Sequence, residues 1–235
     1  MPLQKKHKGK MANKNNSLMN VNDRWERIED YMEENKKMMT ILLAIVAIVV
    51  GGFITFKYWY IPSQEQEAEM AMRGAQNYFT RDSVNRAIKG DGANLGFQDI
   101  ADQYSLTPAG KLANYYLGLC YYQKQDYQKA IDNLEKFNAN DVLVSANAAG
   151  VEGDAEMQLN NTDKAIDYYL EAVKRSDNEY TAPMYMKKAA QAYEIKGDYT
   201  SALNLYQNIR SKYFNFAEAN QIDKYIARAQ VKTGK

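Results

Sequence analysis

Residues 118–131, GLCYYQKQDYQKAI, decide how this chain folds, because two later stretches repeat their pattern. The second is GDAEMQLNNTDKAI, which starts at Gly153, and the third is AQAYEIKGDYTSAL, which starts at Ala190. The starts lie 35 and then 37 residues apart, and each stretch has a small first residue, a polar or glycine-containing turn and an alanine twelve positions later. A repeat of this length indicates a stack of similar helical hairpins.

The spacing is typical of tetratricopeptide repeats, in which each unit is a pair of antiparallel helices. The first helix then presents a small residue to an alanine of the second helix, because only small side chains allow so close an approach. The expected pairs are Gly118 with Ala130, Gly153 with Ala165, and Ala190 with Ala202. The predicted fold class is therefore all-α, a tetratricopeptide-repeat α-solenoid. Its hairpins are predicted at about 111–140, 146–178 and 183–213, after an irregular first hairpin at 64–108 and before a capping helix at 218–231.

The second repeat departs from the pattern at Glu156. The other two repeats have Tyr121 and Tyr193 at this position, one helical turn after the small residue. A carboxylate in place of an aromatic ring predicts a looser or more solvent-exposed middle hairpin.

An apolar run before the repeats has the length of a membrane span. Residues 38–56 carry no charge, and eleven of these 19 residues are Ile, Leu, Val or Phe. As a helix the run covers about 28 Å, close to the thickness of bilayer hydrocarbon. We predict a transmembrane helix at 38–61, starting at Met38, with Lys57 after Phe56 snorkelling and Trp59 at the headgroups. A cleaved signal peptide is the rival interpretation, but its apolar region is shorter and ends in small residues.

The basic residues lie mainly on one side of this run. Nine lysines and arginines precede it, whereas Lys57 and Arg73 are the first to follow it. The positive-inside rule then predicts a cytoplasmic N-terminus and an exported segment 62–235. We expect a disordered basic cytoplasmic tail at 1–21 and a juxtamembrane amphipathic helix at 22–37.

Composition argues against catalysis in segment 62–235. His7, the only histidine of the chain, lies outside this segment, so Ser-His and Cys-His mechanisms and histidine metal sites are excluded there, and Cys120, the only cysteine, has no histidine to act with. Acidic groups are expected on solvent-facing helix surfaces; these are Asp99 with Asp102, and Glu152 with Asp154 and Glu156. The segment has 20 basic and 23 acidic residues, a net charge of −3, which offers nucleic acid little to bind. We predict no enzyme activity, metal, cofactor or small-molecule substrate.

The first helices of the repeats are expected to line a concave protein-binding groove. Counting along these helices gives nine groove positions: Tyr115, Leu119, Tyr122, Asp154, Met157, Met184, Lys187, Gln191 and Glu194. Tyrosine and methionine make an adaptable, mildly apolar surface that suits extended polypeptide. The alternative is that another helix of the same protein covers these positions.

The order of these features resembles the YfgM-like family of membrane-anchored tetratricopeptide proteins. The resemblance is carried by the basic tail, the single span, FQDIADQY at 97–104, TPAGKLANYYLG at 107–118, the three hairpins and IDKYIARAQ at 222–230. It implies a single-pass protein of the bacterial inner membrane with a periplasmic C-terminal domain. It also implies an ancillary Sec translocon component that works beside a PpiD-like periplasmic chaperone and assists exported chains. A scaffold or adaptor of another cell-envelope complex, without unfolded clients, is the alternative.

Overall fold

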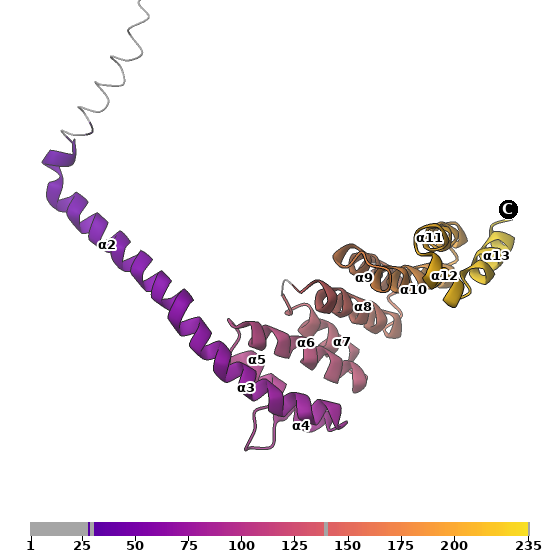
Figure 1. Ribbon diagram of the computed structural model, residues 1–235, viewed down its shortest axis with the longest axis horizontal. Coiled ribbons are helices and arrows are strands. Elements are labelled where there is room, and N and C mark those ends of the chain that lie inside the picture. Colours follow the sequence, from indigo (N-terminus) through magenta and orange to yellow (C-terminus); the bar gives the residue numbers. More distant parts are fainter. Residues whose placement is uncertain (1–27, 29–30, 139–140, 235) are drawn as a thin grey trace, which may run out of the picture. The chain divides into compact units, whose positions relative to one another are not determined.

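The computed structural model describes residues 28, 31–138 and 141–234. The predicted tail at 1–21 and half of the predicted helix at 22–37, namely residues 22–27, 29 and 30, lie outside these residues. The described elements are all helical (Figure 1). They fall into two units, Met1–Trp59 and Tyr60–Lys235.

The first unit contains one long apolar helix. Helix α2 (Lys36–Thr55) continues into a π-helical turn, η1 (Phe56–Tyr60). The helical stretch Lys36–Thr80 has the length and composition of a membrane span, and none of its apolar window is buried. The hydroxyls of Thr40 and Thr55 donate to carbonyl oxygens one turn earlier, at 2.7 and 2.9 Å. Internal bonding of this kind is what a helix surrounded by hydrocarbon requires.

The second unit begins with three helices where the sequence predicts one irregular hairpin. They are α3 (Ile61–Thr80), α4 (Val84–Lys89) and α5 (Phe97–Gln103). Pro62 lies in the first turn of α3, directly after the π-helical turn η1, and has no N–H to donate to that turn. The short helix α4 was not predicted from the sequence. After it, Gly90 takes a φ of +73°, which favours glycine, and turns the chain into the loop before α5.

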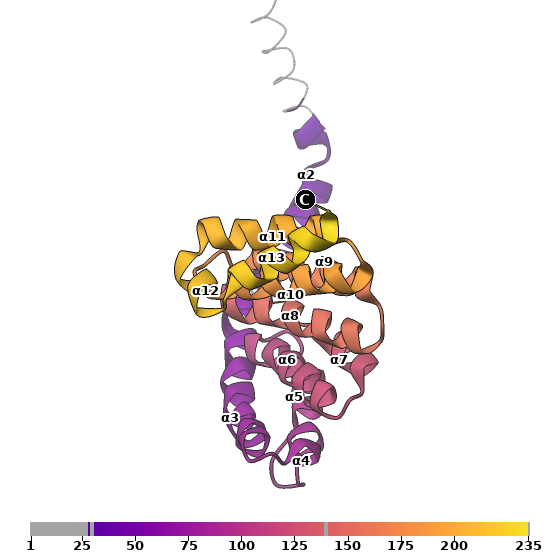
Figure 2. The ribbon, with the colours of Figure 1, turned by 90° about the vertical axis from the view of Figure 1, so that its right-hand side faces the viewer.

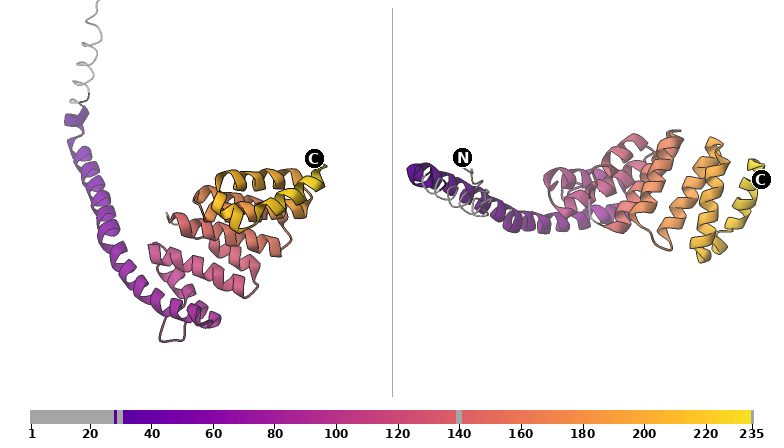
Figure 3. Two further views of the ribbon diagram at one scale, coloured as in Figure 1. Left: turned by 45° about the vertical axis from the view of Figure 1, so that its right-hand side comes forward. Right: turned by 90° about the horizontal axis from the view of Figure 1, so that it is seen from above.

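Three hairpins follow, stacked in chain order (Figures 2 and 3). The first pairs α6 (Pro108–Gln123) with α7 (Tyr127–Leu134), and the second pairs α8 (Val142–Gln158) with α9 (Thr162–Arg175). The third pairs α10 (Thr181–Lys196) with α11 (Tyr199–Lys212). The second helices α7 and α11 begin at aspartates, Asp126 and Asp198, whose carboxylates accept backbone N–H groups of the first turn.

The predicted approach of small residues is confirmed. A Cβ added to Gly153 would lie 2.6 Å from the Tyr169 ring and 3.2 Å from the Ala165 carbonyl oxygen. A Cβ added to Gly118 would overlap Leu134 and lie 3.1 Å from the Ala130 carbonyl oxygen. In the third repeat, Ala190 and Ala202 are both fully buried in one cluster.

Two expectations are corrected by the structure. Glu156 is only 3% exposed, so the middle hairpin is not loosened at this position. It accepts a hydrogen bond from the Asn161 side chain at 2.7 Å and lies 3.4 Å from Lys164 Nζ, which compensates its burial. The predicted capping helix 218–231 is two helices, α12 (Phe214–Ala219) and α13 (Ile222–Thr233). Gln221, with a φ of +52°, separates them.

Helix α13 closes the stack, since it packs against α11 as α10 packs against α9. Its buried face consists of Ile222, Ile226 and Ala229, in one cluster with Tyr206. At the other end of the unit, Cys120 is fully buried, and burial raises the pKa of its thiol to about 12.

Candidate functional site

The nine predicted groove positions are all at least partly accessible in the structure. Met184 is 37% exposed, and the other eight are partly buried. The structure brings three of them, Asp154, Met157 and Gln191, to one hollow of about 220 Å³. Gln191 and Glu194 line a second hollow of about 560 Å³. The remaining five, which line neither hollow, are Tyr115, Leu119, Tyr122, Met184 and Lys187.

The smaller hollow, between α8 and α10, is organised by the Asp154 carboxylate. Lys188 Nζ donates to both Asp154 oxygens, at 2.8 and 2.6 Å, and the Tyr169 hydroxyl donates to Oδ1 at 2.7 Å. Lys188 Nζ also lies 5.7 Å from the ring centre of Tyr169 and 5.6 Å from that of Tyr185. The charges of this hollow therefore compensate one another within the protein.

The tyrosines around this hollow keep their protons at neutral pH. Burial, and then the nearby Asp154 carboxylate, raise the pKa of Tyr185 to about 12. The same two causes raise the pKa of Tyr122 and of Tyr169. Tyr115 donates its hydroxyl to Asn147 Oδ1 at 3.0 Å. Neutral hydroxyls can donate to or accept from a peptide backbone without a change of charge.

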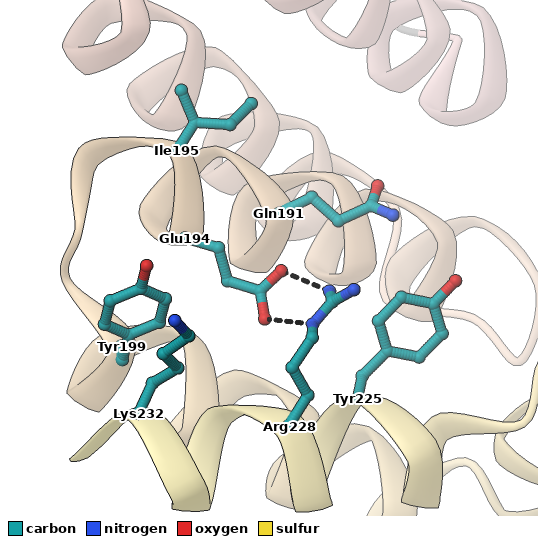
Figure 4. A pocket seen from close by; sticks show the side chains of 7 residues that line it. All are labelled: Gln191, Glu194, Ile195, Tyr199, Tyr225, Arg228 and Lys232. Carbon is teal, nitrogen blue, oxygen red and sulfur yellow. Dashed lines mark hydrogen bonds and ion pairs between the residues drawn. The ribbon is translucent and has the colours of Figure 1, made fainter.

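The larger hollow joins α10 and the closing helix α13 (Figure 4). Arg228 donates two hydrogen bonds to the Glu194 carboxylate, one from Nε to Oε1 at 3.2 Å and one from Nη2 to Oε2. The Arg228 guanidinium lies 5.0 Å from the Tyr225 ring centre. Lys187 Nζ lies 5.1 Å from the same ring and donates to Asn220 at 3.2 Å.

The two hollows share Gln191 and Ile195, so they adjoin along α10. We call their combined surface the inner groove; its residues are Asp154, Met157, Tyr169, Lys188, Gln191, Ala192, Glu194, Ile195, Tyr199, Tyr225, Arg228 and Lys232. Ile195 is 67% exposed and offers an apolar contact between the two hollows. Among the described residues, no group of three or more His, Cys, Asp or Glu side chains could hold a metal. The arrangement suits binding of polypeptide.

Several groove residues were missed from the sequence. Lys188 is adjacent to the predicted Lys187, and Ile195 is adjacent to the predicted Glu194. Tyr225, Arg228 and Lys232 recur at helical spacing along α13, but that segment was assigned only a capping role. Their spacing could have predicted these groove residues. A closing helix that packs like the first helix of a repeat also has one face toward the groove.

Two predicted solvent-facing carboxylates are buried instead. Glu152 and Glu156 are each 3% exposed. Burial raises the pKa of Glu152 to about 7, although the Arg175 charge lowers it. Asp154 is partly buried, while Asp99 is partly buried and Asp102 exposed.

Comparison with known proteins supports the repeat assignment. Two family profiles, both described as tetratricopeptide repeat, match residues 112–141 and 151–212. Comparison with curated protein sequences gave no match. A crystal structure of the MamA protein is similar at 20% identity with a TM-score of 0.56, covering 71% of this chain and 82% of that one. A second MamA structure has 20% identity and a TM-score of 0.50, covering 68% and 94%. The chain thus contains tetratricopeptide repeats in an all-α solenoid, a fold that generally binds other proteins.

Proposed function

We propose that this protein is a membrane-tethered protein–protein interaction module that holds extended polypeptide segments in the inner groove. The observation that carries the proposal is an accessible groove on the first helices of a tetratricopeptide solenoid. Four of its five charged side chains are already paired within the protein, Lys188 with Asp154 and Arg228 with Glu194. A ligand therefore needs few matching charges there, which favours loose sequence preference.

We further propose that helix α2 spans the bacterial inner membrane, with a cytoplasmic N-terminus and a periplasmic repeat domain. The support is the excess of basic residues before the apolar run. In this arrangement the protein is an ancillary component of the Sec translocon, which acts beside a PpiD-like chaperone on emerging chains. Tethering raises the effective concentration of the groove near the membrane toward about millimolar, so weak binding suffices.

The second candidate is a scaffold of another envelope complex. It has the same groove but a single folded partner at fixed ratio. The two candidates therefore differ in what lies against Ile195, which is 67% exposed where the two hollows meet.

Photocrosslinking in intact membranes tests the proposal. A photoreactive amino acid replaces Ile195 in one variant and Asn204, exposed on the second helix α11, in the matched control. Crosslinks from Ile195 to translocon subunits and to many exported chains, weak or absent at Asn204, are expected. One folded envelope protein at constant yield would favour the scaffold. Equal adducts at both positions would contradict a role for the groove.

A further inference from the structure

A third hollow, larger than either hollow of the inner groove, lies apart from that groove on the second helices α7 and α9. Its volume is about 900 Å³, and it shares no residue with either inner hollow. Leu170 and Val173, both partly buried, supply apolar surface to it, and the buried Ile131 lies beneath. We call it the outer hollow.

The early end of α7 leaves this surface uncovered. Helix α7 has 8 residues, whereas α9 and α11 have 14 each. The chain turns inward at the end of α7, because its last residue Leu134 and the following Phe137 are buried in a cluster with Ala148. The flank of α9 next to α7 therefore has no helix of equal length opposite it.

Negative charge predominates around the outer hollow. Four carboxylates line it, from Glu135, Glu156, Asp167 and Glu171, against the two ammonium groups of Lys164 and Lys174. Lys164 pairs with Glu156 at 3.4 Å, and Glu171 pairs with both Lys174 at 3.8 Å and Arg175 at 3.2 Å. Among the described residues, Glu135 and Asp167 form no ion pair.

Nearby carboxylates affect the hydroxyl of Tyr168, a residue that also lines the hollow. Tyr168 donates to Glu135 Oε1 at 2.9 Å. Its pKa is raised by burial, by this hydrogen bond and by the charges of Glu152, Glu135 and Glu156. Carboxylates from α8 and from the end of α7 thus act on the same hydroxyl.

We propose that the outer hollow binds a short basic segment of a partner protein. An aliphatic side chain of the partner packs on Leu170 and Val173, and lysine or arginine side chains next to it pair with Glu135 and Asp167. A basic peptide fits because the excess charge is negative, which also disfavours anionic lipid or an acidic peptide. This surface is separate from the inner groove, so one domain can hold two different proteins at once.

Fluorescence anisotropy with defined peptides tests this inference. The full-length protein in a neutral maltoside detergent is titrated against labelled KKLKK, with EELEE and KKSKK as comparison peptides and empty micelles as blank. KKLKK is expected to bind more tightly than either comparison peptide and to weaken with added salt. The double variant Glu135→Lys with Asp167→Lys is expected to bind KKLKK at least about tenfold more weakly, ~1.4 kcal/mol, and to prefer EELEE.

A matched pair of substitutions separates a local site from bulk charge. Glu218→Lys with Asp223→Lys makes the same change of charge at exposed positions of α12 and α13. This control is expected to keep KKLKK affinity within about twofold. Equal losses in both double variants, an unchanged affinity after Glu135→Lys with Asp167→Lys, or no binding of KKLKK would each overturn the inference. Circular dichroism melting of every variant verifies that the fold is intact.

Discussion

Glu152 is a carboxylic acid buried inside a helical hairpin. It lies on α8 at 3% exposure, and its pKa rises from an ordinary 4.5 to about 7. Burial is the main cause; the Glu135 charge adds to it and the Arg175 charge opposes it. Between these two pH values the folded protein holds a proton that the unfolded chain has released. The free energy of unfolding therefore falls as pH rises through this window and stays lowered above it.

Glu152→Gln is expected to remove this pH dependence. The variant should match the original protein near pH 4.5 and exceed its unfolding free energy by up to about 3 kcal/mol at pH 8. Urea denaturation followed by circular dichroism at a series of pH values measures the difference. Parallel pH profiles for the two proteins would show that the proton on Glu152 has no such effect.

Gly153 lies where α8 and α9, the two helices of the middle repeat, approach each other closely. Gly153→Ala places a methyl group against the Tyr169 ring, and we expect a loss of about 1–3 kcal/mol despite the better helix propensity of alanine. The first repeat has Leu134 at the position of Tyr169. Adding Tyr169→Leu should therefore recover part of the loss, as a double-mutant cycle of unfolding free energies would show. Strict additivity would argue against contact between these positions.

The contact at Gly153 could be predicted from the sequence, whereas the burial of Glu156 could not. Close approach of small residues follows from the repeat spacing, and the repeat is visible three times. The burial of Glu156 depends on its partners Asn161 and Lys164, which come close to it only after the hairpin turn has formed. From sequence alone a carboxylate is predicted to face solvent, because Asp and Glu are seldom buried without a partner.

Helix α13 has two faces with different roles. Ile222, Ile226 and Ala229 close the core, while Tyr225 and Arg228 face the inner groove. Ile226→Asp should destabilise the third hairpin by several kcal/mol, since it buries a charge without a partner. Lys224→Asp, on the exposed side, should change stability by less than about 1 kcal/mol. Limited proteolysis and thermal melting compare the two; equal protease resistance would mean that α13 does not close the stack.

Short helices set the limit of sequence-based prediction here. The long helices of the three hairpins each carry enough periodic residues to be recognised, as α9 does over 14 residues. Helices α4 and α12 have 6 residues each, fewer than two full turns, so no periodicity can be counted. The break at Gln221 has no glycine or proline to mark it, since a glutamine takes the left-handed conformation there.

The division of the chain into two units leads to a prediction for the whole protein. Residues 62–235 contain the described core clusters, so this segment alone should fold and melt like the same unit in the full chain. If the protein acts at the membrane, the detached and exported segment should nevertheless fail to replace the full chain. Complementation of a deletion strain measures this, and full activity of the detached segment would contradict the tethering proposal.

The proposed membrane arrangement rests on composition alone, because charge bias and hydropathy are properties of the chain that need no tertiary contacts. The inner groove could be predicted only in part, since Tyr225 and Arg228 reach it through the packing of α13 on α11. The outer hollow could not be predicted at all. It depends on where α7 ends and on the inward turn of Phe137, and neither is encoded by the repeat.

The burial of Cys120 has a practical consequence for labelling. Its thiol is shielded from solvent and, with a pKa of about 12, forms almost no thiolate at neutral pH. Maleimide and spin-label reagents should therefore leave the folded native chain unmodified. A single cysteine introduced at any exposed position becomes a unique attachment point, so spectroscopic distances and accessibility from either side of a bilayer can be measured without first removing the natural thiol.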